Sequence, residues 1–219
     1  MGKIVKLLAK YYPVYLSGLW GTLWISVVTV LLGLVLGMLV ALMRMSRSKL
    51  LNAVSGVYIE VLRGTPILLQ LYFFWIGLPK LVPFELSDTQ CIVVALAVNA
   101  SAFISEIIRA GIAAVDKGQW EAAQSIGLSE THVMTHVILP QAVKNILPAL
   151  CNEFISTVKG TSLASVFFVG ELMTSFKTVQ SATFLALQSL TIVGVIYFIL
   201  NFVLSRLLKI LERRLMVSD

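Results

Sequence analysis

Residues 20–42 read WGTLWISVVTVLLGLVLGMLVAL, and this uncharged stretch decides the fold. It holds 23 residues, and a helix needs about 20 apolar residues to cross a bilayer. A second run, Thr178–Ser205, is uncharged over 28 residues. Because lipid offers the backbone no hydrogen-bond partners, such runs must form helices, and the alternating pattern of a barrel strand is absent. The sequence therefore predicts an all-α integral membrane protein.

The composition supports lipid as the solvent of the whole chain. Hydrophobic residues make up 58%, charged residues only 13%, and the mean hydropathy is +0.91. A soluble domain carries roughly a quarter charged residues. Lys3, Lys6 and Lys10 precede the first run, but the run is too long for a signal peptide and no cleavage site follows it. We expect one transmembrane domain over residues 1–219, with the first run retained as a span.

Three further apolar stretches are interrupted by charges: Leu51–Val82, Ile92–Ala114 and Ile146–Val169. Together with the two uncharged runs they predict five transmembrane helices. The predicted connections are Arg44–Lys49, Pro79–Asp88, Asp116–Lys144 and Gly170–Lys177. An odd number of crossings places the two termini on opposite sides of the membrane.

The distribution of basic residues predicts the orientation. The Arg44–Lys49 loop, the 116–144 segment and the tail with Arg206, Lys209, Arg213 and Arg214 share one face in this topology. Lysine and arginine are enriched in cytoplasmic loops. We therefore expect a multi-pass membrane protein with the N-terminus outside and the C-terminus in the cytoplasm.

Residues 116–144, called the elbow below, are patterned as two short helices around a glycine. Asp116 is a candidate N-cap for a first helix with Trp120, Ala123 and Ile126 on one face, and Gly127 suits a left-handed helix end. Ser129 is a candidate cap for a second helix, which Pro140 is expected to stop. The pattern predicts a rigid helix-Gly-helix knob on the cytoplasmic face.

The spacing within the elbow resembles the EAA motif of the permease subunits of ATP-binding-cassette (ABC) importers. The motif residues here are Glu121, Ala122, Ala123 and Gly127, followed by Val137, Ile138, Leu139 and Pro140. Val137 replaces the usual isoleucine and keeps a β-branched apolar side chain. Other stretches are similar to the polar amino-acid (histidine, glutamine and arginine) branch of that family: Arg63-Gly64-Thr65-Pro66 with Gln70, the run Asn99–Gly111, Asn152-Glu153-Phe154 and Thr161-Ser162-Leu163.

The resemblance implies a five-helix permease of the bacterial cytoplasmic (inner) membrane that dimerises with an identical or homologous second permease chain. It implies two copies of a separate ATPase subunit, gripped through the elbow, and an extracytoplasmic binding protein that delivers the amino acid. The chain itself contains no Gly-x4-Gly-Lys-Ser/Thr loop for phosphates. We therefore expect no enzyme activity and no cofactor in this chain, with ATP bound by the partner, and we expect no nucleic-acid partner.

The elbow residues have distinct expected roles in coupling to the ATPase. The alanines Ala122 and Ala123 let the helix seat closely, Gly127 makes the bend and Glu121 anchors the elbow by its charge, while Leu139 and Pro140 close the motif. His132 and His136 are spaced i, i+4 in the elbow, but no third ligand is evident and no metal site is expected.

Glu153 is the strongest candidate for a substrate contact. It lies seven residues inside its apolar stretch, and the nearest cation in sequence is Lys159. A lone charge at membrane depth costs about 2.5–3.5 kcal/mol on the lenient insertion scale, so a functional counter-charge is the default hypothesis. An inter-helix ion pair and a protonated buried acid are the alternatives. The expected companions at the substrate site are Asn99, Gln70, Ser156, Thr157, Thr22 and Ser26.

Two structural questions stay open at this stage. Glu60 with Arg63, and Glu106 with Arg109, are each spaced i, i+3 and are expected to pair within their helices, with a gating or inter-subunit contact as the alternative. Thr22, Ser26, Thr29, Gly33 and Gly37 form one stripe of small or polar residues, which is either a packing surface or the wall of a passage.

The leading interpretation is the permease of an ABC importer for polar amino acids, with the basic ones (arginine, lysine, histidine) and glutamine as candidates. One rival is an ion-coupled secondary amino-acid transporter, which acids inside spans would favour. Another is a membrane-embedded enzyme, which needs a nucleophile or metal constellation that the sequence does not show.

Overall fold

The computed structural model describes residues 2–216, with side chains over residues 2–210, and that part of the chain contains helices and no strand. The α-helices are α1 (Gly2–Arg44), α2 (Lys49–Gly64), α3 (Ile67–Leu81), α4 (Asp88–Ala113), α5 (Lys117–Ser125), α6 (Glu130–His132), α7 (Leu139–Gly160), α8 (Leu172–Thr183) and α9 (Ala186–Met216). A π-helical segment, Val133–Ile138, joins α6 to α7, and a 3-10 segment, Thr161–Phe167, follows α7. The all-helical prediction is confirmed.

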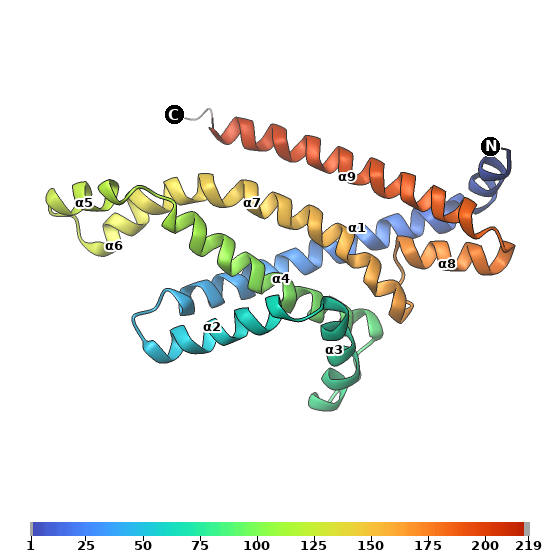
Figure 1. Ribbon diagram of the computed structural model, residues 1–219, viewed down its shortest axis with the longest axis horizontal. Helices are drawn as coiled ribbons and strands as arrows, with labels where there is room; N and C mark the ends of the chain where they lie inside the picture. Colours follow the sequence, from blue (N-terminus) through green and yellow to red (C-terminus); the bar gives the residue numbers. More distant parts are fainter. Residues whose placement is uncertain (1, 217–219) are drawn as a thin grey trace.

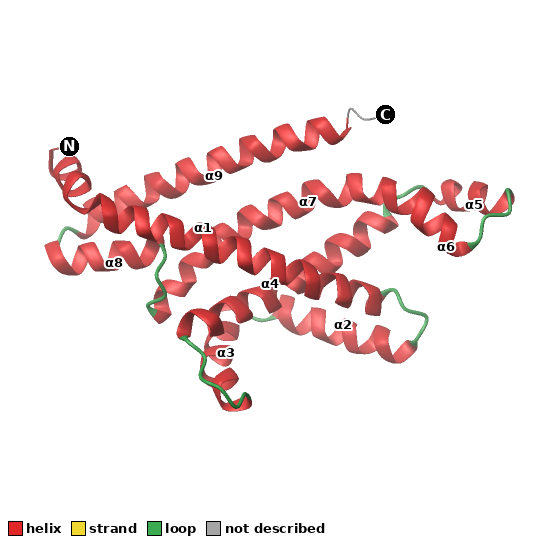
Figure 2. Ribbon diagram, turned by 180° about the vertical axis from the view of Figure 1, so that it is seen from behind, coloured by secondary structure: helices red, strands yellow, loops and turns green. Residues whose placement is uncertain are grey.

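The molecule is elongated, with long helices running between two ends (Figure 1). The helices of the elbow, α5 and α6, lie at one end together with the α1–α2 connection. The N-terminal part of α1 and helix α8 lie at the other end, and α9 runs from there back toward the elbow (Figures 1 and 2).

Helix α1 packs closely against α4 through two glycines of the small-residue stripe. A Cβ atom added at Gly33 would lie 3.2 Å from the Ala100 Cβ, and one added at Gly37 would lie 2.8 Å from Ile104. Small residues of this kind let helix backbones approach each other. The stripe is therefore a packing surface, and its partner around Gly33 and Gly37 is α4.

The predicted stretch Leu51–Val82 is two helices rather than one. Helices α2 and α3 meet at an angle of 110°, with Thr65 and Pro66 between them in extended conformation. A residue before proline is disfavoured in the helical region, and proline here opens α3, where its missing N–H costs nothing. By length and composition α1, α4 and α9 are able to cross a membrane, and the bent pair counts as a fourth span if taken as one.

The second correction concerns the predicted loop Gly170–Lys177 and the span Thr178–Ser205. Helix α8 occupies Leu172–Thr183, so residues 178–183 belong to it, and the break comes at Phe184. Phe184 has φ 58° and a side chain that is 91% exposed. A left-handed residue at this position ends α8 and lets α9 begin at Ala186. An uncharged run gives no sign of such a break.

Most of the local geometry predicted for the elbow is present. The Asp116 carboxylate accepts a hydrogen bond from the Gly118 N–H at 2.6 Å, and the Ser129 hydroxyl accepts one from the His132 N–H at 3.5 Å. Gly127 has φ 83°, a left-handed conformation. Trp120 and Ala123 pack against a buried cluster as expected. Ile126 does not, because α5 ends at Ser125 and the Ile126 side chain is 78% exposed.

The prediction that Pro140 stops the second elbow helix is wrong. Pro140 lies in the first turn of α7, and the chain continues from the π-helical segment Val133–Ile138 into α7 without a break. Local π-helical adjustments let a helix tolerate a proline, and the π-helical segment lies just before Pro140. The elbow is therefore joined directly to the helix that carries Glu153.

Candidate functional site

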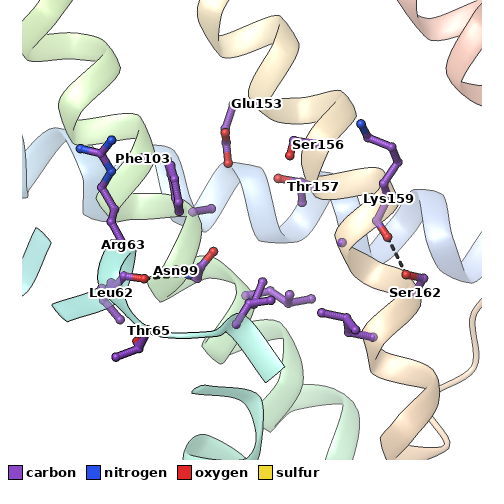
Figure 3. A pocket seen from close by; sticks show the side chains of 15 residues that line it. Leu62, Arg63, Thr65, Asn99, Phe103, Glu153, Ser156, Thr157, Lys159 and Ser162 are labelled. Carbon is purple, nitrogen blue, oxygen red and sulfur yellow. Dashed lines mark hydrogen bonds between the residues drawn. The ribbon is translucent and has the colours of Figure 1, made fainter. Parts of the chain in front are cut away.

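A polar cavity of about 570 Å³ lies where α7 faces α4 and the bend between α2 and α3 (Figure 3). Four of the predicted substrate contacts line it, namely Glu153, Ser156 and Thr157 from α7 and Asn99 from α4. The bend brings Thr65 and Ile67 to the same cavity. The break at Pro66, which the sequence pattern did not predict, thus forms part of the wall.

Glu153 is only partly buried, and its carboxylate has no ion pair and no hydrogen bond within the part of the chain that the structure describes. Lys159 also lines the cavity, but it lies six residues further along α7, about one and two-thirds turns away. The carboxylate is directed into the cavity (Figure 3). No counter-charge among the described residues therefore holds it there.

Asn99 is oriented by Gln70, which is buried behind the cavity wall. The Asn99 amide nitrogen donates to the Gln70 Oε1 at 2.8 Å. The Gln70 amide nitrogen donates in turn to the Leu62 carbonyl and the Thr65 hydroxyl, each at 2.8 Å. Gln70 thus ties the α2–α3 bend to α4. It does not line the cavity, whereas Asn99 keeps its own Oδ1 available for a ligand.

Thr22 and Ser26 lie elsewhere. Both are fully buried between helices, where the Ser26 hydroxyl donates to the Thr22 carbonyl at 2.6 Å. The Thr22 hydroxyl accepts a hydrogen bond from the Leu172 N–H at 3.1 Å. Thr22 therefore attaches α1 to the start of α8, and neither residue lines the cavity.

A second cavity of about 600 Å³ adjoins the first on the elbow side. Three residues, Arg63, Phe103 and Glu153, line both cavities. The remaining walls of the second cavity come mainly from small residues of α4 and from α7, including Gly111 and Ala149. The two spaces together follow α7 from the α2–α3 bend toward the elbow.

The charged residues near the place where the two cavities meet do not all form the pairs that the sequence predicted. Arg109 forms two hydrogen bonds with Glu106, at 2.9 and 3.0 Å, so that predicted pair is confirmed. Arg63 lies 3.8 Å from the same Glu106, and among the described residues it forms no ion pair with Glu60. The i, i+3 spacing on α2 was overridden because α4 presents an acid to the end of that helix.

One buried acid was missed by the sequence analysis. Glu171 is fully buried and caps α8, accepting hydrogen bonds from the Met173 N–H at 2.8 Å and the Thr174 N–H at 2.6 Å. The Tyr197 hydroxyl of α9 donates to it at 3.0 Å. Glu171 therefore fixes the start of α8 against α9. Its position just before a helix was the available signal, and assigning residues 170–177 to a loop concealed it.

The elbow presents an exposed surface at its end of the molecule. Glu121, Ala122, Gly127, Leu139 and Pro140 are exposed, whereas Ala123 is buried. An ion pair of 2.6 Å between Arg47 and Glu130 links the α1–α2 connection to α6.

The two histidines of the elbow stack on each other. The ring centroids of His132 and His136 are 5.2 Å apart. Within residues 2–216 no group of three or more potential metal ligands gathers, here or elsewhere.

The chain resembles several proteins of known family. Residues 33–217 match the model of the family described as "Binding-protein-dependent transport system inner membrane component". The arginine transport system permease protein ArtQ of Bacillus subtilis is 41% identical, over 94% of each chain. The L-cystine transport system permease protein TcyB of the same organism is 37% identical, over 94% of this chain and 88% of that protein. A crystal structure of an amino acid ABC transporter with histidines superposes with a TM-score of 0.90 at 43% identity, covering 94% of this chain and 96% of that one.

Proposed function

The chain belongs to the family of binding-protein-dependent transport system inner membrane components, and from this we propose how it moves its cargo. It is the permease subunit of an amino-acid ABC transporter in the inner membrane. The ion-coupled alternative receives no support from the relatives. The remaining questions are the path through the membrane, the source of energy and the site that holds the amino acid.

We propose five membrane crossings. α1, α4 and α9 provide three, the bent α2–α3 pair a fourth and α7 a fifth. The elbow end faces the cytoplasm, and the N-terminus of α1 faces outside. The location of the α1–α2 connection beside the elbow supports this arrangement, because the arginines and lysines of both segments then share one side (Figure 1).

The exposed face of the elbow is proposed to dock a separate ATPase subunit. Two ATPase copies would serve two permease chains, and an extracytoplasmic binding protein would deliver the amino acid. The direct continuation of the elbow into α7 supports this role, since movement of the elbow would be passed to the helix that carries Glu153.

The substrate site is proposed to be the cavity around Glu153, with Asn99, Ser156 and Thr157 as contacts and Gln70 as the residue that positions Asn99. The single observation that carries this assignment is the Glu153 carboxylate, which lies in a polar cavity without a counter-charge among the described residues. A carboxylate in this setting favours a ligand with a positive group. The α-ammonium of any amino acid provides one, and arginine, lysine or histidine provides a second in its side chain.

The energy source is tested by uptake into membrane vesicles that contain the chain with its ATPase. Uptake of radiolabelled L-arginine or L-glutamine should stop when internal ATP is removed, even with proton and sodium gradients maintained. The same vesicles with ATP and with the gradients collapsed should still accumulate the amino acid. Uptake that follows the ion gradients and ignores ATP would contradict the proposal and restore the secondary-transporter interpretation.

A further inference from the structure

Arg63 occupies the junction of the two cavities. It lies in the last turn of α2, just before the bend, and with Phe103 and Glu153 it lines both spaces. Figure 3 shows its guanidinium group beside Phe103, with Glu153 reaching in from α7. The place where the two cavities meet is therefore bordered by a cation and an anion.

The guanidinium group of Arg63 is held in place but has unused hydrogen-bond donors. Its nearest acid, Glu106, is 3.8 Å away and is already engaged by two shorter hydrogen bonds from Arg109. Within the described residues Arg63 donates no hydrogen bond, and 46% of its side chain is exposed. Its central carbon lies 5.5 Å from the centroid of the Phe103 ring, which is a cation–π contact.

A planar guanidinium group with free donors is suited to a carboxylate, which it binds through two parallel hydrogen bonds. An amino acid carries its ammonium and carboxylate groups on one carbon atom, so the residues that bind them must be neighbours. Arg63 shares both cavities with Glu153, whereas Lys159 lines only the first of them.

We propose that Arg63 binds the carboxylate of the transported amino acid at this junction while Glu153 binds its ammonium group. This assignment rests on the proposed function and adds the residue that distinguishes an amino acid from the corresponding amine. Glu106 keeps the guanidinium group near the junction without competing strongly for its donors.

The test compares ligands that differ only in the carboxylate. Dissociation constants are measured for L-arginine and agmatine, and for L-glutamine and 4-aminobutanamide, on the purified complex of the chain with its ATPase in nanodiscs without ATP. In Arg63→Gln the amino acid should bind about tenfold more weakly or worse, while the amine binds within about twofold of the parent. Arg63→Lys keeps the positive charge but loses the two parallel donors of the guanidinium group. Its affinity for the amino acid should lie between those of the parent and Arg63→Gln. The unchanged affinity for the amine shows that the variant is folded.

Two matched variants control for charge alone. Lys80→Gln, on the exposed end of α3, and Lys159→Gln should both keep the parent's preference for amino acid over amine. The assignment is overturned if Arg63→Gln still prefers the amino acid over the amine. It is also overturned if Lys159→Gln, and not Arg63→Gln, loses that preference. The proposed function would stand in both cases, because the amino acid still binds. If the parent binds none of the four ligands, the substrate site falls and the Arg63 assignment falls with it.

Discussion

Gly37 shows how little space separates the two helices at the centre of the fold. A Cβ atom at Gly37 would lie 2.8 Å from Ile104 and 3.0 Å from the Ser101 carbonyl oxygen, which is closer than such atoms approach in proteins. A valine there must push α1 away from α4. Overpacking of this kind costs typically about 1–3 kcal/mol.

We therefore predict that Gly37→Val lowers the thermal unfolding midpoint of the purified chain. Gly194 of α9 is the matched control, because a Cβ atom there meets nothing within 4 Å. Gly194→Ala should leave the midpoint unchanged or raise it slightly, since alanine favours helix over glycine by about 1 kcal/mol. Equal midpoints in Gly37→Val and the parent would show that α1 and α4 are not packed as described.

At the scale of elements, the elbow could be predicted from the sequence more fully than the bundle. Asp116, Gly127 and Ser129 act through local hydrogen bonds and backbone conformation, which residue type determines directly. The break at Pro66 could have been predicted, because a proline disfavours a helical conformation in the residue before it. Leu51–Val82 was instead interpreted as one span interrupted by charges. The end of α8 at Phe184 could not be predicted from the sequence, because a left-handed conformation contradicts the local preference of phenylalanine.

The residues of the candidate site also differ in how well the sequence alone identified them. Glu153 was identifiable because an isolated acid in an apolar stretch is conspicuous, and Ser156 and Thr157 follow from helical spacing. Arg63 was assigned to Glu60 because spacing along one helix cannot reveal that α4 brings Glu106 to the end of α2. Thr22 and Ser26 were grouped with the site because a polar stripe looks the same in sequence whether it faces a cavity or another helix.

The elbow itself carries a prediction about assembly. Gly127 has φ 83°, so Gly127→Val should cost about 1 kcal/mol or more and misdirect the residues that follow. Glu121→Lys reverses a charge on the exposed face without disturbing the core. Both variants should lose ATPase in co-purification from detergent, while Lys80→Gln at the far end of α3 should retain it. If both variants retain the ATPase and transport normally, the docking assignment is wrong.

At the scale of the whole molecule, the five crossings that we propose would place the two ends of the chain on opposite sides of the membrane. We predict that a reporter active only outside the cytoplasm gives a signal when fused before α1 and none when fused after the C-terminal tail. The tail residues Arg213 and Arg214 lie outside the described side chains, so their part in setting the orientation rests on the sequence alone. Signals from both fusions would mean that both termini lie outside the cytoplasm. The number of crossings would then be even, and one of the five proposed crossings would be wrong.

The elbow is continuous with α7, and α7 lines the cavity around Glu153. The π-helical segment passes directly into α7, and α7 carries Glu153, which lines both cavities. A partner that moves the elbow would therefore move the carboxylate that we propose as the substrate contact. Coupling and substrate binding should then be separable by mutation, since they lie at different points along one helix.

The substrate site around Glu153 is tested most directly by the uptake of L-arginine and L-glutamine. Uptake is measured for Glu153→Gln in vesicles that contain the ATPase and internal ATP. The variant keeps the shape of the side chain and removes its charge. Glu60→Gln, an exposed acid of α2 outside both cavities, is the matched control. We predict that Glu153→Gln assembles and hydrolyses ATP at the basal rate but loses uptake, while Glu60→Gln transports like the parent. Uptake by Glu153→Gln at the parent rate would contradict the substrate site.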